Sequence, residues 1–458
     1  MASVIVGKVK IIATIGPATE KPEILKELIK YVDGVRINFS HGNPEEWRTR
    51  VTNVRDIRGD ITVLGDLRGP GVRTGSMNPI TLNVGDSVEF RLADKSSGGF
   101  VPIPDPSFFR IITIDDVIVM NDGRLRLRVD EIRGNNALLT AMTAGTIMQE
   151  KAVVVKGKDY PMPILDDYDR NALKLAVEVG MDYVGISHVR SSDDIEEVRA
   201  ELRRLGGDWI KLVAKIEGPD AVRNMKDIVC ASDYVMVARG DLGMHFDLEE
   251  IPRIQSSIVK EAQKCGKPIM VATQLLESMI EQPVPTRAEV VDITNAVMEG
   301  VDSLLLTGET AVGKYPIEAV QWLRRVASEY EDEVRVDREV LANLTDRLAL
   351  GIVQLAEDIG AKIVIYSRGG RFVEAISRYR PRVPTYVGVS DEKLLRRLRL
   401  YWGVEPIMIK DVKDYDEGER ETLNDLIRKG LVAKGDLVLL THGVIDTYND
   451  YSIRIIRI

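Results

Sequence analysis

The chain has very few cysteines and histidines for its length. Its 458 residues include two cysteines, Cys230 and Cys265, and four histidines. Two cysteines are too few for a disulfide framework or a zinc site. We therefore expect Cys230 and Cys265 to be unpaired thiols, buried in or near helices. The four scattered histidines likewise argue against a histidine-rich metal centre.

The sequence also lacks the features of membrane and nucleic-acid-binding proteins. No apolar run reaches the roughly 18 residues that a membrane-spanning helix needs. The first residues, MASVIVGKVKIIATIG, predict a strand and not a signal peptide, so we expect a cytoplasmic protein. The net charge of -9 argues against nucleic acid as a partner, because binding its backbone needs a clustered basic surface. Phosphorylated small molecules are not excluded, since they need only a local positive pocket.

A regular alternation of short apolar strands and helical segments fills most of the sequence. Continuously apolar strands that alternate with helices are typical of a parallel sheet buried on both faces. Eight such units favour a closed (β/α)8 barrel of the TIM type over an open sheet. The predicted strands are 9–14, 35–38, 61–66, 183–187, 212–216, 234–238, 268–273 and 303–307.

Nearly every predicted strand ends in a polar residue. Such ends are where the active site of a (β/α)8 barrel lies. One polar strand end would mean little, because chains reach the surface there, but a series of seven indicates a site. The seven residues are Asn38, Asp66, Ser187, Lys215, Arg239, Thr273 and Thr307.

Two segments depart from the alternation and predict further domains. Residues 74–155 alternate apolar and polar positions, and Asn121-Asp122-Gly123 is a hairpin-turn signal, so we expect a small all-β lid domain. After residue 335, a long helix at 339–359 precedes strands at 362–366, 385–389, 406–409 and 437–441, which predicts an α/β domain with an open sheet. The predicted domains are a barrel from 1–73 and 156–334, a lid at 74–155, and a regulatory or oligomerisation domain at 335–458.

Charged residues gather where two neighbouring strands end, at 211–243. Lys215 and Glu217 occupy alternate positions, so both can point the same way. Asp241 begins a predicted glycine-flanked turn after the next strand. Magnesium prefers a few carboxylates together with substrate oxygens and water, which Glu217 and Asp241 could supply. Taken alone, Lys215 and Glu217 could equally form a plain ion pair.

Seven motifs, in order, resolve this ambiguity. They are RINFSHG (36–42), GDLRGPGVRTG (65–75), KIEG (215–218), MVARGDLG (236–243), ATQLLESM (272–279), PTRAE (285–289) and LTGETA (306–311). The set closely resembles the pyruvate kinase family. The resemblance implies phosphoryl transfer from phosphoenolpyruvate to ADP, giving pyruvate and ATP. It also implies Mg²⁺ or Mn²⁺, usually K⁺, and commonly a homotetramer.

The resemblance also implies roles for individual residues. Glu217 and Asp241 would bind the divalent cation. The monovalent cation would be held by Asn38, Ser40, Asp66 and the Leu67 carbonyl. Catalysis and substrate binding would involve Arg36, Lys215, Gly240, Asp241 and Thr273, with Lys215 stabilising the phosphoryl group and the enolate. The nucleotide would be bound by Asn38, His41, Arg73 and Lys156.

The chain departs from the family pattern at several positions. Gly71 replaces a glutamate associated with K⁺ dependence, so we expect K⁺ activation to be weak or absent. His188 replaces a phenylalanine, and we expect it to pack as that ring would. The segment after Lys156 is shortened. In the C-terminal domain, a loop predicts either a tight turn or a site for a phosphorylated effector, with fructose 1,6-bisphosphate disfavoured: Ser367, Arg368, Gly369, Gly370 and Arg371.

Two other classes of protein fit part of the pattern. A Mg²⁺-dependent lyase acting on a 2-oxoacid could share Lys215, Glu217 and Asp241, but would need neither RINFSHG nor the lid. A non-catalytic regulatory relative is disfavoured by the intact site residues. A requirement for ADP separates the kinase from the lyase, and ATP formation eliminates the regulatory relative.

Overall fold

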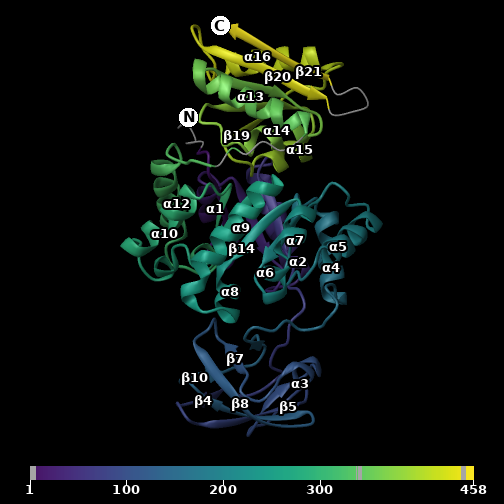
Figure 1. Cartoon of the computed structure of the whole chain (residues 1–458), viewed down its shortest axis with the longest axis vertical. Coiled ribbons are helices and arrows are strands. Elements are labelled where there is room, and N and C mark those ends of the chain that lie inside the picture. The colour runs from purple at the N-terminus through teal and green to yellow at the C-terminus, as the bar shows by residue number, and fades with distance from the viewer. Residues whose placement is uncertain (1–6, 337, 339–342, 445–449) are drawn as a thin grey trace.

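The computed structural model describes residues 7–336, 338, 343–444 and 450–458. Figure 1 shows three parts in a row, with the inserted β domain and the C-terminal domain at opposite ends of a central barrel. The predicted fold class is confirmed. Among the described residues, none of the helices combines the length and the apolar character needed to cross a bilayer.

The central barrel consists of eight parallel strands, closed in the order β1-β16-β15-β14-β13-β12-β3-β2. Each strand lies within one residue of its predicted ends. The strands are β1 (Lys10–Thr14), β2 (Gly34–Asn38), β3 (Thr62–Asp66), β12 (Tyr183–Ile186), β13 (Lys211–Ile216), β14 (Tyr234–Ala238), β15 (Ile269–Ala272) and β16 (Ser303–Leu306). The helices around them are α1 (Pro22–Leu28), α2 (Pro44–Ile57), α4 (Asp167–Glu178), α5 (Ser192–Arg204), α6 (Pro219–Arg223), α7 (Met225–Ala231), α8 (Arg239–His245), α9 (Ile251–Cys265), α10 (Arg287–Met298), α11 (Gly308–Ala311) and α12 (Pro316–Tyr330), with 3-10 turns η1 (Leu248–Glu250) and η2 (Glu277–Ile280).

The helix starts follow local sequence signals. Helix α2 begins after Asn43, whose side chain accepts the backbone N–H groups of Glu45 and Glu46, and proline follows at the first helical position. Helix α10 begins with a capping box between Thr286 and Glu289. These signals fix the lengths of the loops above the barrel, from which the site is built.

The inserted domain is a six-stranded sheet in the order β11-β7-β8-β9-β5-β6 with a separate β10-β4 pair. Its Asn121-Asp122-Gly123 turn joins β7 to β8 as predicted, and all three residues have positive φ angles of 52°, 54° and 89°. The elements are β4 (Ile80–Leu82), β5 (Ser87–Leu92), β6 (Val101–Ile103), α3 (Ser107–Ile111), β7 (Val117–Met120), β8 (Leu125–Arg133), β9 (Asn136–Ala141), β10 (Gly145–Ile147) and β11 (Val154–Val155).

The C-terminal domain has an open sheet in the order β19-β18-β17-β20-β21. Its first four strands are parallel, as a sheet with crossover helices requires, and β21 adds an antiparallel edge that the sequence pattern did not predict. The start of the predicted 339–359 helix lies outside the described residues. The elements are α13 (Leu344–Ile359), β17 (Lys362–Tyr366), α14 (Arg371–Ser377), β18 (Thr385–Val389), α15 (Glu392–Leu398), β19 (Val404–Met408), α16 (Tyr415–Arg428), β20 (Leu437–Val444) and β21 (Asp450–Arg457).

Four aspartates clamp the amino ends of alternate barrel strands. The four aspartates come directly before β2, β12, β14 and β16. Each accepts a backbone N–H from the barrel strand that comes before it in the chain, and each pairs with an arginine. The N–H donors are 2.8–2.9 Å away: Ile11 for Asp33, Val63 for Asp182, Leu212 for Asp233 and Ile269 for Asp302. The arginines are Arg324, Arg55, Arg199 and Arg380, respectively. Because buried carboxylates are costly unless paired, this pattern fixes the register of the barrel floor.

The barrel interior is completed by a residue of the C-terminal domain. Leu400, which is 0% exposed, packs with Ile12, Leu64, Met236 and other interior side chains. Its backbone carbonyl accepts the hydroxyl of Tyr234 at 3.0 Å. The C-terminal domain therefore closes the barrel from the end opposite the polar strand ends.

The cysteine expectation was wrong. Cys230 on α7 and Cys265 on α9 form a disulfide, with their Cα atoms 5.4 Å apart, and Cys230 is exposed. Helices α7 and α9 follow the neighbouring strands β13 and β14, so the barrel brings them side by side although the cysteines are 35 residues apart. Cysteine counting misses such a pair because the proximity arises only in the closed barrel.

Replacing both Cys230 and Cys265 with serine should lower the melting temperature. Closing a loop of this length is worth about 3–4 kcal/mol of stability in the chain-entropy view. Calorimetry of the double variant and of the oxidised wild type measures the effect, and the wild type with a reductant serves as the control. Equal melting temperatures for the oxidised protein and the double variant would contradict the prediction.

Candidate active site

A cavity of about 640 Å³ lies at the carboxyl ends of the barrel strands, between the barrel and the lid. Its lining brings together most of the residues that the sequence singled out: Arg36, Asn38, Ser40, His41, Asp66, Leu67, Arg73, Lys215, Glu217 and Asp241. These residues come from β2, β3, β13, α8 and the loops that follow them. Of the seven polar strand ends, Asn38, Asp66, Ser187 and Lys215 therefore meet at one cavity, whereas Arg239, Thr273 and Thr307 are not among its lining residues.

Lys215, at the end of β13, is the central cation of this cavity. Its Nζ donates to Ser187 Oγ at 2.7 Å and lies 3.2 Å from Glu217 Oε2 and 3.5 Å from Asp66 Oδ1. Burial lowers the pKa of Lys215, but Asp66, Glu217 and Asp241 outweigh that effect and raise the pKa above the ordinary value of lysine. Lys215 therefore stays charged and is held in place by its neighbours.

Glu217 and Asp241 form a pair of buried acids beside Lys215. Burial raises the pKa of Glu217, and burial together with Glu217 raises the pKa of Asp241 to about 6. Apart from its ion pair with Lys215, Glu217 Oε2 has no hydrogen-bond partner among the described residues. Two close carboxylates with a free buried oxygen fit a divalent cation.

The remaining ligands of such a cation would have to come from outside the protein. The described part of the chain contains no group of three or more His, Cys, Asp and Glu side chains arranged to hold a metal. Magnesium commonly binds through one or two carboxylates together with substrate oxygens and water. The prediction that Asp241 begins a turn was wrong, because Asp241 lies in helix α8.

The residues proposed for a monovalent cation lie next to Lys215. Asp66 Oδ2 is 2.7 Å from Arg36 Nε, while its buried Oδ1 has no hydrogen-bond partner in the described chain. Burial favours protonation, but Lys215 and Arg36 outweigh it and lower the pKa of Asp66. Asn38 Oδ1 accepts Ser40 N at 3.0 Å, and the Leu67 carbonyl accepts the Ser187 hydroxyl at 2.8 Å. The four predicted residues thus lie in one region, where their oxygen atoms can accept further contacts.

Thr273, in the loop after β15, and Gly240 are not among the cavity residues, but Thr273 contacts Gly240 next to Asp241. Thr273 Oγ1 accepts the backbone N–H of Gly240 at 2.8 Å. Thr273 and Gln274 have φ angles of 67° and 54°, which strain residues other than glycine. Arg239 donates to the carbonyls of both residues and pairs with Asp292 at 2.6 Å. Arg239, to which the sequence assigned no role, therefore holds the strained loop in place.

The lid docks on the helix that carries Asp241. Met244 of α8 is buried against Val119 and Val154 of the lid. Lys156, predicted to bind nucleotide, instead pairs with Asp247 of the barrel at 2.6 Å and is not among the cavity residues. These contacts hold the lid directly above the site.

Lys151 is a cavity residue that the sequence reasoning missed. It lines the cavity from the lid. Burial lowers the pKa of His41, which lines the same cavity, and the charges of Arg73, Arg36 and Lys151 lower it further. The bridge between Arg73 and Ala152 brings Lys151 to the barrel. The sequence around Lys151 contains no motif that marks it, because it is a single lysine in a segment without regular structure.

Comparison with known proteins identifies the family. The model of the family "Pyruvate kinase, barrel domain" matches residues 6–320, and that of "Pyruvate kinase, alpha/beta domain" matches residues 346–452. The chain belongs to the pyruvate kinase family. Members of this family are phosphotransferases that convert phosphoenolpyruvate and ADP to pyruvate and ATP in the final step of glycolysis, and they use a divalent metal.

Individual relatives match over nearly their whole lengths. A pyruvate kinase of Pyrobaculum aerophilum is 42% identical over 417 residues, covering 89% of this chain and 90% of that protein. One of Aeropyrum pernix is 40% identical over 441 residues, covering 94% and 95%. The crystal structure of pyruvate kinase from Pyrobaculum aerophilum superposes with a TM-score of 0.88 at 39% identity, covering 98% of this chain and 99% of that one.

The structure shows what surrounds two residues that depart from the pyruvate kinase pattern, Gly71 and His188. A Cβ added at Gly71 would meet no atom within 4 Å, so a side chain can leave the backbone there without a clash at its first atom. His188 does not simply replace a packed ring, because it lines the cavity with Nδ1 3.6 Å from Glu217 Oε1. Burial lowers the pKa of His188 to about 4, so its ring is neutral near pH 7.

The predicted effector loop joins β17 to α14 in the C-terminal domain. Gly370 N donates to Ser367 Oγ at 3.0 Å, which closes a tight turn. The Arg368 guanidinium donates to two carbonyls, Val412 and Lys413, and lies over the Tyr415 ring. Arg368, Gly369 and Arg371 are all exposed, and the side chain of Arg368 is engaged by groups of its own domain.

Proposed function

We propose that phosphoryl transfer takes place in the cavity between barrel and lid, with Lys215 as the central catalytic cation. The supporting observation is the position of Lys215 Nζ, within 3.5 Å of Asp66, Glu217 and Ser187. Phosphoryl transfer depends on positioning and charge stabilisation more than on covalent catalysis. A buried, permanently charged lysine supplies both to the transferring oxygens and to the enolate.

Glu217 and Asp241 would hold Mg²⁺ or Mn²⁺. The bound cation would neutralise phosphate charge and align the phosphoryl oxygens. Among the protein groups, Arg36 would contact the phosphoryl group, and the backbone of Gly240 and Asp241 with Thr273 would hold the substrate carboxylate. Thr273 is a weak acid, so it would order a water or a relay that delivers a proton to the enolate carbon.

The nucleotide would bind beneath the lid. His41 and Arg73 line the cavity and would contact the phosphates, next to Asn38. Lys156 would take part only after leaving Asp247, whereas Lys151 already faces the cavity. The binding of phosphoenolpyruvate and ADP together explains why one cavity contains so many cations.

The monovalent-cation site would consist of Asn38, Ser40, Asp66 and the Leu67 carbonyl. We expect weak or absent K⁺ activation in the wild type, because Gly71 lacks the carboxylate associated with K⁺ dependence. Gly71→Glu should increase K⁺ activation at least several-fold, since the added side chain can leave the backbone without a clash at its Cβ. Initial rates with K⁺ and with a tetraalkylammonium salt at equal ionic strength measure this. Strong activation of the wild type would refute the expectation.

Beyond the active site, we propose a cytoplasmic homotetramer with the domain boundaries predicted above. Two apolar surfaces support assembly. Leu248 borders a second cavity of about 660 Å³ beside α9 and α10 and is 69% exposed. Ile453 and Ile455 are 45% and 49% exposed on β21, an open sheet edge that favours pairing with another strand. The loop at 367–371 would serve a phosphorylated effector only if Arg368 changed partners.

A pyruvate-release assay with phosphoenolpyruvate, ADP and Mg²⁺ tests the proposed function. Pyruvate and ATP should form together, and omission of ADP should stop pyruvate release. Pyruvate release without ADP would favour the lyase alternative. Adding candidate effectors and measuring mass by sedimentation would test the effector loop and the tetramer.

A further inference from the structure

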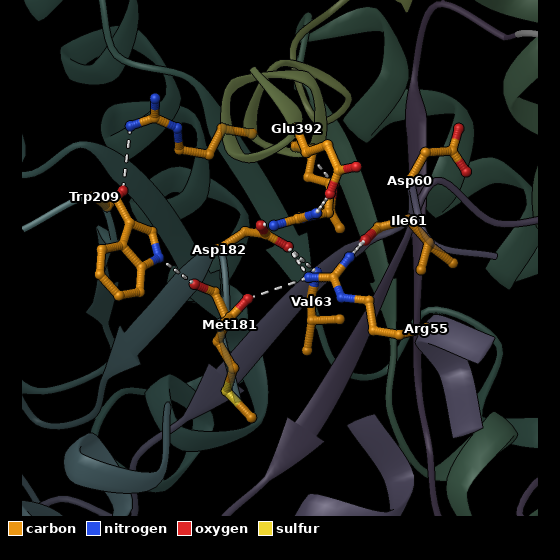
Figure 2. A network of polar contacts seen from close by, with 12 residues as sticks. Arg55, Asp60, Ile61, Val63, Met181, Asp182, Trp209 and Glu392 are labelled. Carbon is orange, nitrogen blue, oxygen red and sulfur yellow. Dashed lines mark hydrogen bonds and ion pairs between the residues drawn. The ribbon is translucent and has the colours of Figure 1, made fainter. Parts of the chain in front are cut away.

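The C-terminal domain contacts the base of two strands that lead to the active site. Figure 2 shows Asp182 between Arg55 of the barrel and the C-terminal helix that carries Glu392. From that helix, α15, Arg396 Nε donates to Asp182 Oδ1 at 2.9 Å. The carbonyl of Arg397 accepts the hydroxyl of Tyr183, the first residue of β12, at 2.8 Å. The base of β12 is therefore held from the C-terminal domain.

Asp182 joins three parts of the molecule through one buried carboxylate. Its Oδ2 accepts Val63 N of β3 at 2.8 Å and pairs with Arg55 of α2 at 2.6 Å. Its Oδ1 takes Arg396 of the C-terminal domain, and the side chain is 1% exposed. The relative register of β3 and β12 thus depends on a group that the C-terminal domain also binds.

The opposite ends of the same two strands carry the site. Ser187, directly after β12, accepts Lys215 Nζ and donates to the Leu67 carbonyl, which follows β3. The next residue, His188, donates its backbone N–H to Glu217 Oε1 at 2.7 Å. Strand β12 is short and is paired on both sides, with β3 and β13. We therefore expect a shift of β12 along its axis, starting at its base, to displace Ser187 as well.

Two of the other aspartate clamps hold the barrel floor without a partner from the C-terminal domain, whereas the third, Asp302, pairs with Arg380 of that domain. Asp33 pairs with Arg324 and Asp233 with Arg199, both within the barrel. Asp182 has a barrel arginine of its own in Arg55. Arg396 is thus an additional partner, which links a clamp that is already paired to the C-terminal domain.

We propose that Arg396 and Asp182 are positioning residues for phosphoryl transfer, which tie the placement of the C-terminal domain to Ser187, Lys215 and Glu217. The proposal rests on the roles proposed above for Lys215 and Glu217. Misplacement of reacting groups by about 1 Å can cost on the order of 100-fold in rate. A small movement of α15 relative to the barrel would therefore change the rate without any contact with substrate.

The test compares Arg396→Ala with Arg199→Ala, which removes an arginine from the Asp233 clamp within the barrel. Hydrogen exchange of peptides covering residues 184–190 is measured without substrates, and kcat and KM are measured by pyruvate release. Arg396→Ala should speed exchange of the His188 amide about tenfold and lower kcat about tenfold, with a smaller change in KM. Arg199→Ala should leave exchange of the His188 amide near wild type, because Asp233 holds β13 and keeps Lys211 as a partner at 3.3 Å. Arg396→Lys, which keeps the charge, should show smaller changes in exchange and in kcat than Arg396→Ala. It replaces the alanine variant in the test if that variant does not fold.

Equal exchange at His188 in the Arg396→Ala and Arg199→Ala variants would overturn the proposal. Faster exchange with an unchanged kcat would overturn the positioning role, because the link would not reach the chemistry. Since the exchange experiment contains no substrate, it tests the link even if the assignment of Lys215 fails. That assignment is tested separately by substitution of Lys215.

Discussion

Lys215→Met is expected to lower ATP formation by about 10³-fold, because losing one preorganised charge-stabilising group typically costs 10²–10³ in rate. Methionine keeps the approximate length of the side chain but removes the charge that faces the transferring oxygens. It also leaves Asp66, Glu217 and Asp241 without the cation that stabilises their ionised forms. ATP formation in a coupled assay with saturating Mg²⁺ measures the loss.

Thr273→Ala is the matched comparison for this prediction. Thr273 is proposed to act in protonation of the enolate, so its loss should lower ATP formation less than Lys215→Met does. Exchange of the pyruvate methyl hydrogens, followed by NMR in D₂O, should be impaired in both variants. Near-normal ATP formation in Lys215→Met would contradict the catalytic assignment.

Leu400→Ala is expected to destabilise the barrel by about 2–5 kcal/mol, although Leu400 belongs to the C-terminal domain. Leu400 fills the interior at the barrel floor with Ile12 and Leu64 and has no exposed surface. Its truncation leaves a cavity that the closed barrel cannot readily collapse. Denaturant unfolding gives the loss, and hydrogen exchange locates it in the barrel strands.

Leu398→Ala provides the control for Leu400→Ala. Leu398 is similarly buried, at 1% exposed, but it packs in the core of the C-terminal domain. Its truncation should speed exchange in β17 and β18 and leave the interior barrel strands unaffected. Identical exchange patterns for the two variants would show that Leu400 does not support the barrel.

The location of the barrel floor also bears on regulation. The carbonyls of Arg397 and Leu400 and the side chain of Arg396 all reach the amino ends of barrel strands. The C-terminal domain is therefore part of the barrel's own packing. Any ligand that moves this domain would act on the catalytic unit directly.

The barrel strands could be predicted because each is a short apolar run with a polar end. Buried parallel strands need no alternation, so the signal is continuous and survives without tertiary context. Strand β21 was missed because its apolar run is interrupted and residues such as Ile453 and Ile455 are exposed, although it pairs with the strand directly before it in the chain. The difference is one of burial, which the sequence encodes strongly only for interior strands.

Many of the predicted site residues that line the cavity lie at or next to strand ends. Lys215, Glu217, Asp66 and Asn38 converge because closing the barrel places neighbouring strand ends together. Residues on the inserted lid were harder to assign, since its docking decides whether Lys151 or Lys156 faces the cavity. Sequence order does not determine that docking.

The sequence by itself determined the barrel, the inserted and C-terminal domains, the family and the charged strand ends that form the site. These properties depend on local periodicity and on motifs whose spacing is fixed along the chain. Only the tertiary structure decided the pairing of Cys230 with Cys265, the position of Leu400 in the barrel and the sharing of Asp182 between two domains. Each joins elements far apart in sequence, and their contact follows from packing.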